Sequence, residues 1–102
     1  MDQEPRRLEL HEILLTFADH VYYQAPSSTQ MQYPCIRYQL DSEARQFADN
    51  LPHRRTWRYQ VTVIDLDPSS PIKDKVADLP LCSFSRFYTA DNLNHFVFNL
   101  FF

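Results

Sequence analysis

The chain has 102 residues, a formal net charge of −3 and 44% apolar residues. These values are typical of one globular domain, which we expect to span residues 1–102. The acidic balance argues against a dedicated duplex-DNA binder, which needs a basic face against the phosphates. Glycine is absent, and this excludes the glycine-rich phosphate loops of the Walker and dinucleotide-binding types.

The N-terminal part predicts one helix and then β structure. Apolar side chains recur at the spacing of a helical stripe, at Leu10, Ile13, Leu14 and Phe17. We therefore place a helix over residues 5–18. A short β-prone segment follows at residues 20–24, and a strand is predicted over residues 33–40.

The most regular strand pattern covers residues 54–64. In it, apolar and aromatic residues alternate with polar ones, at Trp57, Tyr59, Val61 and Val63. The polar stretch 41–52 before it is interpreted as the connection of a long β-hairpin that projects from the domain at about residues 41–56. Asn50 is the candidate for a turn residue with positive φ.

The second half predicts a short helix and two further strands. Ser70 is a candidate N-cap, Pro71 suits the first helical position, and Pro80 ends the helix. Strands are predicted over residues 83–89, with Phe84, Arg86 and Tyr88 on one face, and over residues 94–102. Together the elements indicate an α+β fold. A mainly antiparallel sheet of four to five strands carries a long N-terminal helix and a second short helix on one face.

No cofactor, metal or catalytic site is expected. His11-Glu12 begins like a zinc-protease helix, but Leu15 stands where the second histidine is needed. Cys35 with His95 could form a nucleophile–base pair, although a small buried core cysteine is the favoured interpretation. Two cysteines, no signal-peptide pattern and no membrane-length apolar run favour a reducing cytoplasmic setting, with a Cys35–Cys82 disulfide as the alternative.

Arginine is concentrated in the predicted hairpin. Five of the eight arginines lie between residues 37 and 58, so this segment carries +2 while the chain carries −3. One interpretation is a basic arm that docks on an acidic partner, and another is ordinary edge-strand charge that prevents aggregation. Single-stranded nucleic acid is a third, because aromatic residues are interleaved, but Trp57 and Tyr59 share a face with core valines.

Four segments resemble small virion proteins of long-tailed bacteriophages: MQYPCIRYQL at 31–40, FADN at 47–50, YQVTVID at 59–65 and FYTADNLNH at 87–95. The similarity runs from about Leu8 to Phe102, and the family is that of the tail terminators, also called tail completion or minor tail proteins. It implies an α+β subunit that assembles as a six-fold ring on the tail tube in the host cytoplasm. The ring ends tube polymerisation and offers a surface to the neck protein, with DNA passing through the lumen without stable binding.

A closed ring needs two different contact surfaces on each subunit. From charge, projection and aromatic content we assign the candidate interface to Arg45, Phe47, Asp49, Asn50, Arg54, Arg55, Phe101 and Phe102. The resemblance does not supply these residues. Two alternatives stay open: a neck or head–tail connector subunit and, more distantly, a small nucleic-acid-binding domain.

Overall fold

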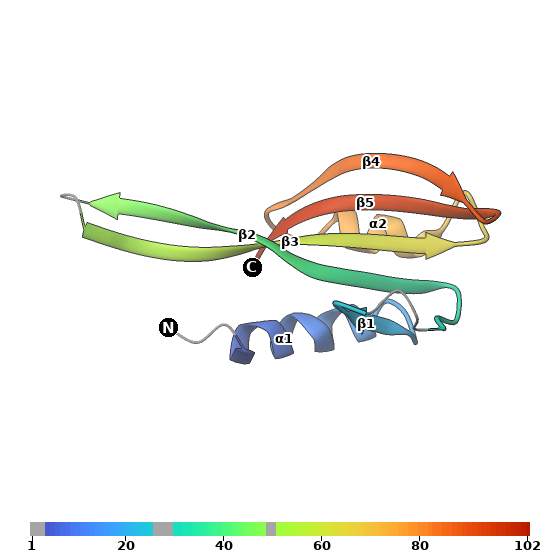
Figure 1. The fold of residues 1–102 in the computed structure, drawn as a ribbon, viewed down its shortest axis with the longest axis horizontal. Helices are drawn as coiled ribbons and strands as arrows, with labels where there is room; N and C mark the ends of the chain where they lie inside the picture. The colour runs from blue at the N-terminus through green and yellow to red at the C-terminus, as the bar shows by residue number, and fades with distance from the viewer. Residues whose placement is uncertain (1–3, 26–29, 49–50) are drawn as a thin grey trace.

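The computed structural model describes residues 4–25, 30–48 and 51–102, and it describes side chains for all of these except 4, 43–48 and 51–56. The fold is α+β, with a five-stranded mixed sheet and two helices (Figure 1). The elements are α1 (Glu4–Leu15), β1 (Val21–Tyr23), β2 (Cys35–Ala48), β3 (Leu51–Asp65), α2 (Pro71–Ala77), β4 (Cys82–Ala90) and β5 (Leu93–Phe101).

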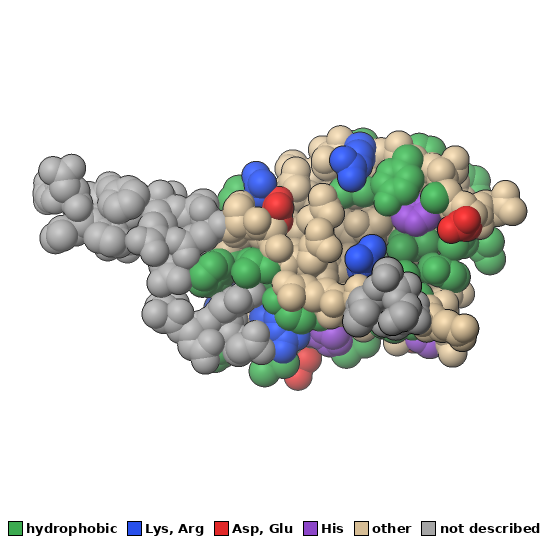
Figure 2. Space-filling model, viewed as in Figure 1, with side chains coloured by type: hydrophobic (Ala, Val, Ile, Leu, Met, Phe, Trp, Pro, Cys, Tyr) green, Lys and Arg blue, Asp and Glu red, His purple; other side chains and the backbone are tan. Residues whose placement is uncertain are grey.

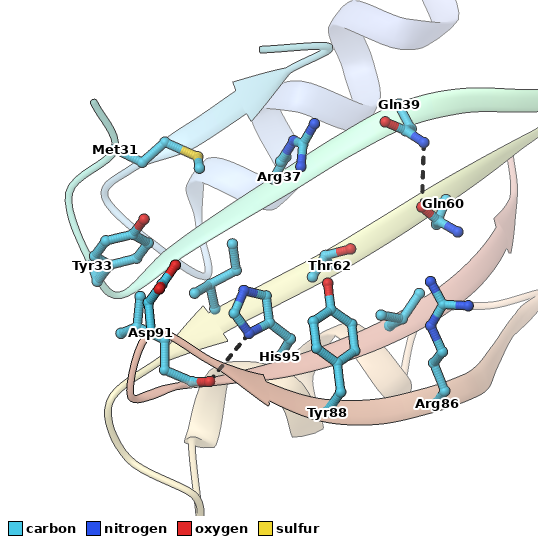
Figure 3. A pocket seen from close by; sticks show the side chains of 13 residues that line it. Met31, Tyr33, Arg37, Gln39, Gln60, Thr62, Arg86, Tyr88, Asp91 and His95 are labelled. Atoms are coloured by element: carbon cyan, nitrogen blue, oxygen red, sulfur yellow. Dashed lines mark hydrogen bonds between the residues drawn. The ribbon is translucent and has the colours of Figure 1, made fainter. Parts of the chain in front are cut away.

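The strand order is β1-β2-β3-β5-β4. The short strand β1 runs parallel to β2, and the other three neighbouring pairs are antiparallel. Figure 3 shows both helices behind the sheet, and their buried side chains belong to one apolar cluster with the sheet. The helices therefore cover one face of the sheet, as predicted, and leave the other face open.

The covered face is built by strict alternation. On β3, Tyr59, Val61 and Val63 are fully buried, and on β5 Phe96, Phe98 and Leu100 are nearly so. Leu10 and Leu14 of α1 and Ile72 and Val76 of α2 complete this core. The period-2 pattern fixes which side chains face inward, because a slip of one residue would move them all to the other face.

Helix α1 is shorter than predicted, with 12 residues ending at Leu15. At its end the amide of Thr16 donates to the Ile13 carbonyl at 3.1 Å, and the Thr16 hydroxyl donates to the same oxygen at 2.6 Å. These bonds close the last turn three residues back, as in a 3₁₀ turn, where the helix ends. The predicted long helix is wrong in length, although Ala18 just beyond it is still buried.

Helix α2 begins as predicted. Ser70 is its N-cap, and its hydroxyl oxygen accepts from the Ile72 amide at 3.2 Å. Pro71 occupies the first helical position. The cap satisfies a backbone donor that has no partner inside the helix.

The polar connection predicted at residues 41–52 is instead strand. β2 continues to Ala48 and β3 begins at Leu51, with the two paired in antiparallel register along this stretch. Backbone hydrogen bonds across a hairpin do not require apolar side chains, so polarity alone did not mark the end of a strand. The turn residue predicted at Asn50 lies outside the described residues.

A bulge corrects the predicted face of β4. The register shifts between Phe84, which pairs with Phe98, and Arg86, which pairs with Val97. The extra residue, Ser85, places Phe84 on the covered face and sends Arg86 to the open face. The predicted grouping of Phe84 with Arg86 and Tyr88 is therefore wrong.

Candidate functional site

The hairpin of β2 and β3 extends well beyond the rest of the sheet. β3 pairs with β5 only as far as Arg58, opposite Phe101, whereas its pairing with β2 continues to Leu51, opposite Ala48. Past Arg58 the sheet is therefore a two-stranded ribbon, seen in Figure 1 as the arm that projects from the five-stranded body. We call this ribbon, residues 42–48 and 51–58, the arm. The molecule measures 50 × 23 × 23 Å along its principal axes.

Four of the predicted interface residues lie on the arm. Arg45 pairs in register with Arg55, and Arg54 pairs with Gln46. Phe47 is opposite Pro52, just after a second register shift. Asp49 and Asn50 lie outside the described residues.

An ion pair stands at the base of the arm. The Nε and Nη2 atoms of Arg58 lie 2.9 and 2.8 Å from Oδ2 of Asp41, across β2 and β3. Both side chains are about one-third exposed (38% and 33%), so the pair contributes modestly to stability. The pair also changes the charge of the hairpin, because Asp41 neutralises Arg58, one of the arginines predicted to make the hairpin basic.

The two C-terminal phenylalanines of the predicted interface have different surroundings. Phe102 packs against the core cluster, and the Arg6 guanidinium lies 4.1 Å from its ring centroid. Phe101 pairs with Arg58 near the base of the arm and is half-buried. Phe102 therefore belongs largely to the body, while Phe101 lies where the body meets the arm.

A further exposed aromatic surface lies along β4, one of the two edge strands of the sheet. Phe84 and Phe87 are 57% and 47% exposed, although each ring also contacts a β5 phenylalanine. Leu81, just before the strand, is 64% exposed. A nine-residue edge strand with exposed aromatic side chains can add a strand or an apolar surface from another chain.

The open face of the sheet carries a polar pocket of about 310 Å³, which the sequence did not predict (Figure 3). One cross-strand row runs through it: Arg37 on β2, Thr62 on β3, Val97 on β5 and Arg86 on β4. The row on one side contains Ile64, His95 and Tyr88, and the row on the other contains Gln39 and Gln60. Met31, Tyr33, Asp91 and Leu93 line the rest.

The pocket side chains contact one another in two places. Gln39 Nε2 donates to Gln60 Oε1 at 3.3 Å. The rings of Tyr88 and His95 are stacked, with centroids 4.6 Å apart and planes 13° from parallel. The amide pair and the aromatic pair therefore form two opposite walls, between which the two arginines lie (Figure 3).

Within the described part of the chain, neither arginine of the pocket has an acidic partner. Arg37 makes no ion pair there, and its Nε atom is buried with no hydrogen-bond acceptor. Arg86 lies 5.7 Å from the centroid of the Tyr88 ring. In Figure 2 the basic side chains are scattered among uncharged polar and hydrophobic ones, and one of them lies beside an acidic side chain.

Alternation along residues 33–40 groups Cys35, Arg37 and Gln39 on one face of the predicted strand, with no indication of a pocket. In the structure Arg37 and Gln39 of that group line the pocket. The position of Arg86 in the pocket depends on the bulge at Ser85, which no periodic pattern indicates. The sequence signal that could have indicated a polar sheet face was the polar character of alternate residues on both β2 and β3.

The pKa of the Cys35 thiol argues against the nucleophile–base pair considered for Cys35 and His95. Burial raises the pKa of the Cys35 thiol to about 12, although the nearby Arg37 lowers it. The thiol is therefore protonated at neutral pH, as expected of a fully buried core cysteine. Both cysteines are free, and the described residues contain no group of three or more metal-ligating side chains.

Comparisons with known proteins assign no family. No protein-family model matches the sequence, and no curated protein matches it either. Among the described residues, no helix is long and apolar enough to cross a membrane.

Proposed function

We propose that this protein is a structural, non-enzymatic subunit that caps the tail tube of a long-tailed bacteriophage as a ring, in the manner of a tail terminator. The ring ends tube polymerisation and presents a surface to the neck protein. This places the chain in the virion, at the end of the tail. The proposal starts from the resemblance of four segments of the sequence to that family.

The arm is the observation that supports this function best. Isolated two-stranded ribbons are marginally stable in water, and this one continues from Arg58 to Leu51 with β2 as its strand partner. An arm of this kind gains stability when another subunit or the tube covers it. Arg45, Arg54 and Arg55 give it positive charge in an otherwise acidic chain.

The edge strand β4 gives the second surface that a ring requires. In a closed ring each subunit meets its neighbours through two different patches. The arm extends from one end of the body (Figure 1). The exposed Phe84 and Phe87 belong to β4, at one edge of the sheet. Aromatic side chains of this kind are enriched in the centres of protein interfaces.

The decisive experiment is electron microscopy of particles from a lysate in which this gene alone is disrupted. Overlong, headless tails are expected, because nothing then stops the tube. Tails of normal length beside separate filled heads would replace the terminator with a neck or connector subunit. Normal infectious particles would exclude both roles.

The arm is tested by reversing its charge. The double variant R54E/R55E should fold normally but fail to restore tails of defined length in the disrupted strain. The matched control is K73E/K75E, which makes the same charge change on α2, away from the arm. Full capping by R54E/R55E would remove the arm from the mechanism, and equal loss in both variants would point to net charge.

A nucleic-acid-binding domain is the more distant alternative. Filter binding to single-stranded DNA at two salt concentrations separates it from the ring protein. Tight binding that falls steeply with salt would favour the alternative, because phosphate contacts release counterions.

A further inference from the structure

We infer that the pocket on the open face of the sheet binds a small oxyanion, held between Arg37 of β2 and Arg86 of β4. This is a ligand site in addition to the proposed capping role, and it does not depend on that role. The ligand is a compound that carries phosphate or carboxylate oxygens. It lies across β3 and β5 with the two guanidinium groups on opposite sides.

The first argument is the register. Arg37, Thr62, Val97 and Arg86 occupy one row across four strands. The two arginine backbones are three strand spacings apart, about 14 Å, and arginine side chains are long enough to approach the middle from both sides. Figure 3 shows Arg86 extending from β4 toward β3, and Arg37 lying over β2 on the other side of Thr62.

The second argument is charge without compensation. Arg58 on the same sheet has its carboxylate partner in Asp41, whereas Arg37 and Arg86 have none among the described residues. The buried Nε of Arg37 lacks even a neutral acceptor. A buried donor without a partner costs free energy, and an anionic ligand that draws the guanidinium toward it would recover part of that cost.

The third argument is the chemistry of the walls. Thr62, Gln39 and Gln60 supply uncharged donors and acceptors beside the arginines. Tyr88, stacked on His95, closes the opposite side. Asp91 is the one carboxylate among the lining residues, so the two arginine cations outnumber the carboxylates of the pocket. Arginine pairs, with hydroxyl and amide groups around them, suit oxygen-rich anions.

Titration with defined anions tests the site. The probes are inorganic phosphate, pyrophosphate and succinate, each added to the ¹⁵N-labelled protein at constant ionic strength with sodium chloride as the reference. NMR follows the Nε–Hε signals of the arginines and the backbone amides of β2 and β4. Saturable shifts confined to the Arg37 and Arg86 side chains and their strands are expected. Binding of the phosphates alone assigns a phosphate ligand, and binding of succinate alone assigns a carboxylate.

Matched variants make the test specific. R37Q and R86Q should each lower the affinity for the tightest-binding probe at least tenfold, and the double variant R37Q/R86Q should abolish binding. K75Q removes the same charge from α2, on the covered side of the sheet, and should change the affinity less than twofold. R54E/R55E should also bind normally, so that failure of the capping role and failure of this site are distinguishable.

Stability provides a second readout. Without ligand, R37Q should unfold at the same temperature as the wild type or higher, because it removes a buried donor without a partner. With a saturating probe, the melting temperature should rise in the wild type, rise less in R37Q and not rise in R37Q/R86Q. Shifts no larger than those with sodium chloride, or equal binding by R37Q/R86Q and the wild type, would overturn the inference.

Discussion

The Nδ1 atom of His11 lies 2.7 Å from the phenol oxygen of Tyr38, and this contact joins α1 to the first part of β2. The two rings are tilted at 56°, with centroids 5.6 Å apart. Arg7, one turn earlier on α1, donates from Nη1 to the same oxygen at 3.5 Å. Two cationic or titratable side chains of the helix therefore converge on one buried tyrosine.

This contact predicts a loss of stability in mild acid. Burial, and then the charge of Arg7, lower the pKa of His11 below its ordinary value of 6.5. The unfolded chain therefore binds a proton more readily than the native protein, and unfolding becomes easier as pH falls below about 6.5. Urea unfolding at a series of pH values between 7.5 and 5 measures this directly.

The variant H11Q is the control for that series. Glutamine cannot titrate and still offers a hydrogen-bonding group to Tyr38, so the pH dependence of H11Q between 7 and 5.5 should be flatter than that of the wild type. Identical slopes in the two proteins would show that His11 does not cause the effect.

The turn between β4 and β5 gives a second prediction. Asp91 and Asn92 have φ values of 53° and 62°, the left-handed conformation at both central positions of a two-residue hairpin turn. Asn92→Ala should destabilise the protein by about 1 kcal/mol, because a Cβ without a compensating polar group is unfavourable there. Thermal unfolding at constant pH measures the change.

Asn92→Gly is the matched variant, because glycine adopts this conformation without a steric penalty. It should be at least as stable as the wild type, although the natural chain contains no glycine. If alanine and glycine were equally destabilising, the asparagine side chain itself, and not the backbone conformation, would hold the turn.

Cysteine alkylation gives a third prediction. With a pKa of about 12, against 9.0 for an ordinary thiol, Cys35 should form roughly a thousandfold less thiolate at pH 8 in the native state. Iodoacetamide labelling of the C82S variant, followed by mass spectrometry, should therefore be far slower in buffer than in urea.

The reciprocal variant C35S reports on Cys82, whose pKa burial also raises but which is only half-buried. Its thiol should react faster than that of Cys35 in the native protein. Native labelling of Cys35 at the urea rate would contradict the burial described for the start of β2.

Much of the fold was predictable because local patterns and tertiary packing agree. The alternation Tyr59, Val61, Val63 predicted the buried face of β3, and the Ser70–Pro71 pair predicted the start of α2. Both signals are local: a side chain two residues away lies on the same face of a strand, and an N-cap needs only its own turn. The face of β2 that carries Arg37 was predictable for the same reason.

The errors occurred where backbone hydrogen bonds, and not the pattern of side chains, decide where an element ends. Polarity predicted a loop at residues 41–52, but cross-strand pairing extends β2 to Ala48. Thr16 closes α1 earlier than its apolar stripe indicated. In each case a hydrogen bond to another part of the backbone outweighed the preference of the side chains.

The sequence by itself determined the α+β class, the covered face of the sheet and an arginine-rich hairpin, because hydrophobic period and charge are properties of neighbouring residues. Only the tertiary structure decided that Arg37 and Arg86, on strands separated by β3 and β5, share one row of an open sheet face. The strand order and the bulge at Ser85 place the two arginines in that row. Both depend on long-range register, which one-dimensional patterns do not encode.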